Sequence, residues 1–213
     1  MDSCLVGSEM CIRDSVVDEA LQRGVVVRAI VRPNSVLPPS LAEAEQQGRL
    51  EVFRLELATA EALHHALSGC TALVIATGAR PSLNLAGPLQ VDAFGVRSQL
   101  SACAAVGLQR VVLVSSLCAG RWRHPLNLFG LILVWKRLGE RWLEQSGLDW
   151  TVVRPGGLSE DDSRLEQEGV VFTAADQQQS ASIPRRLVAQ VCLDALAEPV
   201  SYTHLRAHET RIH

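Results

Sequence analysis

Short apolar runs alternate with helical segments along most of this chain of 213 residues. Residues 25–31, 50–54, 72–76, 110–114 and 150–154 have the apolar, β-branched character of strands that are covered on both faces. The helical segments stop at glycines, which commonly end helices, namely Gly24, Gly48, Gly69, Gly107 and Gly147. This alternation predicts an α/β fold, a Rossmann-like doubly wound parallel sheet with flanking helices.

Length, charge and cysteine spacing narrow the class of protein. A chain with 47% hydrophobic residues can bury one substantial core, and we predict a single domain over residues 16–199. A net charge of −3 without long like-sign runs disfavours nucleic acid and anionic membranes as partners. The cysteines show neither CxxC pairs nor metal-ligand spacing, so we expect no metal and a cytoplasmic protein with reduced thiols.

The longest apolar run extends from Leu126 to Trp135. It is about half as long as a transmembrane helix requires, so we expect no transmembrane segment. The run is typical of a helix that is buried or that contacts a partner protein. Attachment to a membrane surface is the alternative.

Neither end of the chain continues the alternation. Residues 1–15 contain one glycine, Gly7, whereas the phosphate-binding fingerprint of a dinucleotide-binding fold needs three. Residues 200–213 are polar and contain three histidines without a metal-ligand arrangement. Both ends resemble translated sequencing-adapter sequence. We therefore expect a non-native N-terminal segment and a disordered tail, with the first strand, the glycine loop and the last strand missing or replaced. Such a loss would leave an open slot in the sheet.

Two segments could hold the adenosine half and the body of a dinucleotide. Arg32 directly follows the run at residues 25–31, where an arginine suits the 2′-phosphate of NADP and an acid suits NAD. This favours NADP(H) over NAD(H), although a solvated arginine at a strand end is the alternative. Ala76, Thr77 and Gly78 form a small turn after the third run, which allows close approach of a ligand.

A serine pair and a lysine suggest hydride-transfer chemistry. Ser115 and Ser116 end the run VVLVSS, and Lys136 follows on a long helical segment. Ser116 would hydrogen-bond a substrate carbonyl, while Lys136 would hold the nicotinamide ribose. The tyrosine that usually precedes such a lysine by four residues is replaced by Ile132. A proton must then come from water, the substrate or another side chain such as His124.

The last motif, TVVRPGG, ends in Pro155, Gly156 and Gly157, whose glycines let the backbone lie beside a nicotinamide. The order VVLVSS, WK, TVVRPGG resembles the atypical short-chain dehydrogenase/reductase superfamily, in its NAD(P)H-binding, NmrA-like branch. The resemblance implies that Arg32, residues 76–78, Ser115, Ser116, Lys136 and residues 155–157 surround the cofactor. It also implies an acidic contact near the adenine, where this chain offers Glu56.

Three functions follow from these observations. The first is an NADP-dependent oxidoreductase that acts on a small carbonyl or unsaturated substrate. The second is a regulator or assembly factor that senses NADP(H) without turnover and uses the run from Leu126 to Trp135 as its partner surface. The third is a chimeric fragment with impaired cofactor binding, because the amide cradle for the pyrophosphate is lost.

Overall fold

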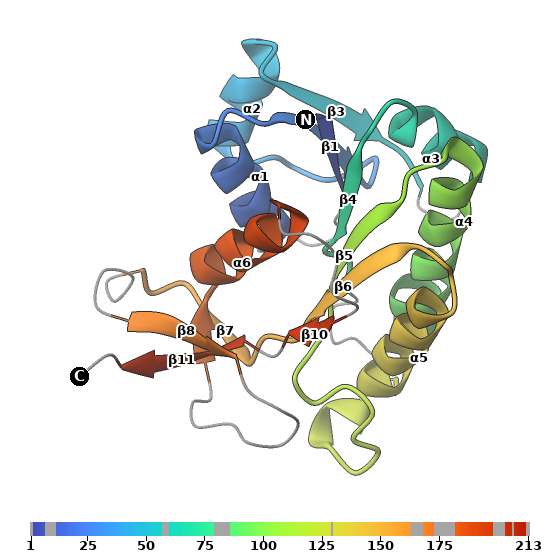
Figure 1. Cartoon of the computed structure of the whole chain (residues 1–213), viewed down its shortest axis with the longest axis vertical. Coiled ribbons are helices and arrows are strands. Elements are labelled where there is room, and N and C mark those ends of the chain that lie inside the picture. Colours follow the sequence, from blue (N-terminus) through green and yellow to red (C-terminus); the bar gives the residue numbers. More distant parts are fainter. Residues whose placement is uncertain are drawn as a thin grey trace.

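The computed structural model describes residues 2–6, 12–56, 60–78, 86–128, 130–162, 168–172, 182–197, 203–205 and 207–211. These residues form a parallel sheet with helices on both of its faces (Figure 1). The predicted α/β class and the doubly wound, Rossmann-like sheet are confirmed.

The central sheet has the strand order β10-β6-β5-β4-β1-β2-β3, and all neighbouring pairs are parallel. The strands are β1 (Asp2–Val6), β2 (Val26–Val31), β3 (Leu50–Arg54), β4 (Ala72–Ile75), β5 (Arg110–Val114), β6 (Asp149–Val153) and β10 (Thr203–Leu205). The strand order reverses between β1 and β4. In open sheets of this kind, ligands bind outside the carboxyl ends of the strands at such a reversal.

Helices cover the two faces in two groups (Figure 1). One face carries α1 (Ile12–Gln22), α2 (Pro39–Gln46) and α6 (Arg185–Ala197), and the other carries α3 (Ala60–Leu67), α4 (Val96–Val106) and α5 (Ile132–Glu144). A π-helical segment η1 (Leu89–Gly95) leads into α4, and a 3₁₀ segment η2 (Pro125–Leu128) precedes α5. Side chains of β5 alternate between the faces, since Val112 and Val114 join one apolar core while Val111 and Leu113 join the other.

Local sequence signals place most of these boundaries correctly. The five predicted strand runs differ from the observed strands by no more than one residue at either end. The glycines predicted to stop helices all have positive φ angles, between 70° and 79°. No side chain would meet an obstacle at these five sites, so backbone conformation alone requires glycine there.

Two small peripheral sheets lie beyond β6. In one, β7 (Gly157–Ser159) pairs in parallel with β9 (Ser182–Pro184), and in the other β8 (Glu168–Phe172) pairs antiparallel with β11 (Ala207–Arg211). β7 begins at Gly157, the last residue of the TVVRPGG motif, so it leads the chain away from the carboxyl end of β6.

Segments at both ends of the chain contribute strands to the sheets. β1 occupies the central position between β2 and β4, so the open slot that we expected is filled. β10 extends the central sheet beside β6, and β11 pairs with β8 in a peripheral sheet. The physical reason is that the edges of β2, β4 and β6 carry unpaired backbone groups that any compatible segment can satisfy. The connection at residues 7–11, where a glycine loop would lie, falls outside the described residues.

Candidate functional site

A cavity of about 210 Å³ lies where β4, β5 and β6 end. It is lined by the turn after β4, by the two serines after β5, by one residue of α5 and by the motif after β6. The lining residues are Ile12, Ala76, Thr77, Gly78, Val114, Ser115, Ser116, Lys136, Pro155, Gly156 and Leu158. Eight of the residues that we predicted to form a dinucleotide site therefore share one cavity, although they come from four separate segments of the chain.

Backbone hydrogen bonds hold the ends of β5 and β6 together beside this cavity. The Ser115 amide donates to the Val153 carbonyl at 2.8 Å, and the Leu117 amide donates to the Pro155 carbonyl at 3.0 Å. The second bond continues the pairing beyond the last residues of both strands. Ser116 lies between these two bonds, so its position relative to Pro155 and Gly156 is fixed by the sheet itself.

Lys136 pairs with a buried carboxylate that the sequence analysis did not single out. Its Nζ lies 2.9 Å from Oδ1 of Asp92, whose side chain is 1% exposed. Asp92 belongs to η1, which packs against α5. The ion pair fixes the ammonium group at the wall of the cavity, and the low exposure of both partners strengthens the attraction between them.

Gly139 lets α5 approach η1 closely enough for this pair to form. A Cβ atom at Gly139 would lie 2.7 Å from the backbone carbonyl oxygen of Asp92. Gly139 lies three residues after Lys136, on the same side of the helix. A side chain at position 139 would push α5 away from η1 and would thereby move Lys136 relative to Asp92.

A buried charge cluster supports α5 one turn beyond Lys136. Arg154 donates two hydrogen bonds to the fully buried Glu140, at 2.8 and 2.6 Å, and Arg137 donates a third at 3.0 Å. Burial acts to raise the pKa of Glu140, but the hydrogen bonds and charge of Arg154 outweigh it and hold that pKa below its usual range. Since Arg154 directly precedes Pro155, this cluster joins α5 to the motif after β6.

The cavity suits the nicotinamide end of a dinucleotide. Thr77 is buried against it, and its Oγ1 has no hydrogen-bond partner among the described residues, so a ligand can supply one. Lys136 provides a cationic donor for ribose hydroxyls, and Gly78 and Gly156 leave room for close contact. The described residues thus fit this half of the cofactor.

The remaining predicted residues lie outside the cavity lining. Arg32 follows β2 and Glu56 follows β3, and both are exposed. Gly157 opens β7 next to the lining residue Gly156. Ile132, at the position of the usual tyrosine, is buried at the start of α5. His124 lies in the loop before η2, where its Nδ1 accepts a hydrogen bond from the Leu126 amide, and it does not line the cavity.

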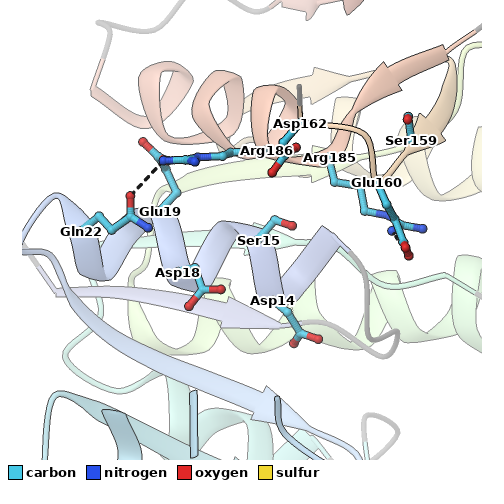
Figure 2. A pocket seen from close by; sticks show the side chains of 10 residues that line it. All are labelled: Asp14, Ser15, Asp18, Glu19, Gln22, Ser159, Glu160, Asp162, Arg185 and Arg186. Atoms are coloured by element: carbon cyan, nitrogen blue, oxygen red, sulfur yellow. Dashed lines mark hydrogen bonds and ion pairs between the residues drawn. The ribbon is translucent and has the colours of Figure 1, made fainter. Parts of the chain in front are cut away.

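A larger polar pocket of about 440 Å³ lies between α1, the start of α6 and the segment after β7 (Figure 2). Its lining residues include five carboxylates but only two arginines, Arg185 and Arg186. Arg185 pairs with Glu160 at 2.5 Å, and burial raises the pKa of Asp14. This excess of acids opposes binding of a phosphate, so the pocket does not suit a dinucleotide.

Comparison with known proteins assigns the family. A family model described as NAD(P)H-binding matches residues 14–199. The chain belongs to this NAD(P)H-binding family. It is therefore a dinucleotide-binding protein of the short-chain dehydrogenase/reductase type, as the resemblance to the NmrA-like branch implied. The cofactor is a nicotinamide dinucleotide.

Individual relatives agree with this assignment. An uncharacterized chloroplast protein of Arabidopsis thaliana is 34% identical over 87% of this chain and 68% of its own length. Sanguinarine reductase of Eschscholzia californica is 28% identical over 73% of this chain and 71% of its own length. A putative NAD-dependent epimerase/dehydratase from Bacillus halodurans has a TM-score of 0.81 at 24% identity, covering 99% of this chain and 95% of that one, which shows the fold. The chain spans less than two thirds of the length of several other curated relatives.

No helix within the described ranges combines the length and apolar character needed to span a membrane.

Proposed function

We propose that this chain is an NADP-preferring member of its family that transfers hydride to a small carbonyl or unsaturated substrate. The observation that carries the proposal is the convergence of Ser116, Lys136 and the turns after β4 and β6 on one cavity. In this interpretation the bound cofactor supplies the hydride. The relative that is named a reductase supports an oxidoreductase function.

Each lining residue then has a specific task. Lys136, held by Asp92, binds the nicotinamide ribose hydroxyls with a fixed geometry. Ser116 donates a hydrogen bond to the substrate carbonyl oxygen, where negative charge develops during reduction. Pro155 and Gly156 form the surface against the nicotinamide ring. Because Ile132 cannot release a proton, the proton for the substrate oxygen comes from water or from an acidic group of the substrate.

The proposed NADP preference depends on Arg32. Its guanidinium, exposed after the carboxyl end of β2, can reach a 2′-phosphate that extends into solvent. The Arg32→Ala variant should lose the preference for NADPH over NADH. Arg49→Ala, which removes another exposed arginine, is the matched control. If the ratio of NADPH affinity to NADH affinity is the same in Arg32→Ala as in the parent chain, Arg32 does not determine the cofactor preference.

A titration with NADPH, followed by the fluorescence of the reduced nicotinamide, tests binding directly. The parent chain should bind, and Lys136→Met should bind at least tenfold more weakly. A second version of the chain has residues 1–15 replaced by a strand and a glycine-rich loop. If this version binds NADPH and the parent chain does not, the parent chain is a fragment with impaired cofactor binding.

Sensing of NADP(H) without turnover is the second candidate, and the buried Ile132 in place of an acid favours it. An enzyme should oxidise NADPH when a panel of carbonyl and unsaturated compounds is added. Tight NADPH binding without oxidation across the panel would favour the regulator. We also propose the cytoplasm as the location of the chain, which fractionation of the source cells would test.

A further inference from the structure

A second pocket, separate from the dinucleotide cavity, lies between the loop after β5 and the outer surface of α5. Its volume is about 530 Å³. The lining residues are Leu117, Ala119, Gly120, Arg121, Trp122, Val134, Trp135, Arg137, Leu138 and Arg141. They include two indole rings and three guanidinium groups, but no acidic residue. We call this the tryptophan pocket.

The two tryptophans have different freedom. The indole Nε1 of Trp135 donates a hydrogen bond to the Gly130 carbonyl at 2.8 Å, which fixes the ring. Trp122 is 72% exposed, so most of its ring has no protein contact. A fixed ring inside a pocket and an exposed ring at its rim together offer flat surfaces on which an aromatic ligand can stack.

The arginines give the tryptophan pocket its charge. Arg137 donates to Glu140 at 3.0 Å and to Glu144 at 2.6 Å, so its charge is balanced behind the pocket. The aliphatic part of Arg137 packs beside Gly120, where a Cβ atom would lie 3.5 Å from Cγ. Arg121 and Arg141 are exposed and add positive charge at the rim, where they can bind an anionic group.

From these features we propose that the tryptophan pocket binds a flat aromatic anion, with its ring against the tryptophans and its negative group beside Arg121 and Arg141. The flat indole surfaces favour an aromatic ring over a flexible chain, and the absence of lining acids favours an anion over a cation. The proposal does not depend on the proposed oxidoreductase function, because none of the ten lining residues belongs to the dinucleotide cavity.

Isothermal titration calorimetry of the full chain with naphthalene-2-sulfonate tests the proposal. A ligand of this size should bind with a dissociation constant of roughly 0.1–1 mM. Two probes separate the contributions of shape and charge. Cyclohexanesulfonate keeps the charge without the aromatic ring, and 2-naphthylmethylamine keeps the ring with the opposite charge. Both should bind at least fivefold more weakly. Equal binding of the anion and the amine, or no binding of naphthalene-2-sulfonate at 5 mM, roughly five times the upper expected constant, would overturn the proposal.

Variants locate the bound probe. Trp122→Ala changes a mostly exposed side chain, so the fold should persist while binding weakens about fivefold. Arg141→Gln should weaken binding at least threefold. The chain offers a matched control, since Arg97 lies 5.5 Å over the ring of Trp142, which is outside the tryptophan pocket. Trp142→Leu and Arg97→Gln should leave the affinity unchanged, and losses equal to those of the pocket variants would refute the assignment.

The alternative occupant is a membrane, because Leu126, Leu128 and Leu131 are also exposed near this surface. Sedimentation with vesicles of phosphatidylglycerol and phosphatidylcholine distinguishes the two. Binding to vesicles that Trp122→Ala abolishes, without binding of naphthalene-2-sulfonate, would assign the surface to a membrane and overturn the proposal. If the sulfonate binds as expected, two vesicle results agree with the proposal. The chain does not bind vesicles, or it binds them equally well with and without Trp122→Ala.

Discussion

Replacement of Gly139 by alanine tests how the site is assembled. The new Cβ atom would lie 2.7 Å from the Asp92 carbonyl oxygen and 3.4 Å from Cγ2 of Val96. Ordinary contact begins near 3.4 Å, so α5 and η1 must separate by about 0.7 Å at this point. Overpacking costs about 1–3 kcal/mol, and a clash with a backbone atom, which cannot rotate away, belongs to the upper part of this range, about 2–3 kcal/mol. The better helix propensity of alanine returns up to about 1 kcal/mol.

The expected net loss is therefore about 1–2 kcal/mol of the free energy of unfolding, or a fall in Tm of roughly 2–8 °C for a chain of this size. Urea denaturation followed by circular dichroism measures it. The same displacement moves Lys136 relative to Asp92, so NADPH affinity should fall as well. Ser101→Ala, on the exposed side of α4, is the control and should be neutral or slightly stabilising. A Gly139→Ala variant as stable as the parent chain would refute the argument.

Three further predictions concern buried charge and buried thiols. Glu140→Gln leaves Arg154 uncompensated and should cost about 3–5 kcal/mol in urea denaturation, whereas Glu45→Gln, in an exposed pair with Arg54, should cost less than about 1 kcal/mol. Equal losses would contradict this. Because the folded pKa of Glu140 lies below 4.5, its contribution is present above pH 4.5 and is lost as the pH falls through the lower folded pKa. The parent chain should thus lose stability more steeply than Glu140→Gln between roughly pH 5 and 3, and parallel curves would refute the shift. Burial raises the pKa of Cys103 and Cys192 to about 12, so iodoacetamide should modify the partly exposed Cys118 before these two, as peptide mass spectrometry can determine. Early modification of Cys103 would contradict its burial.

The sequence predicts the parts of this fold that depend on local patterns. Strand runs, glycine-ended helices and the motifs after β4, β5 and β6 are each recognisable within a few residues. Their convergence also follows from the sequence, since the carboxyl ends of parallel strands meet at one edge of a sheet. Seven of the eight predicted residues in the cavity lining reach it for that reason, and the eighth, Lys136, reaches it from α5.

Contacts between distant segments were not predictable in the same way. Asp92 lies in an apolar context far from Lys136 in the sequence, and only the packing of η1 against α5 brings the two together. Two sequence features do point towards this contact. A lone acid in an apolar helix needs a partner, and a glycine inside a helix, here Gly139, indicates close packing against another segment. The tryptophan pocket depends on how the loop after β5 folds back onto α5, which no periodic pattern indicates.

Lys136 is the only lysine in the chain, and this permits a direct test of the site. Protein labelled with ¹³C-lysine should give one Cε–Hε signal in a carbon–proton correlation spectrum. Addition of NADPH should shift this signal with the same dissociation constant as the fluorescence titration, while adenosine 2′,5′-bisphosphate, which lacks the nicotinamide half, should shift it little. Saturable NADPH binding that leaves the lysine signal unmoved would show that the dinucleotide does not occupy the cavity at the ends of β4, β5 and β6.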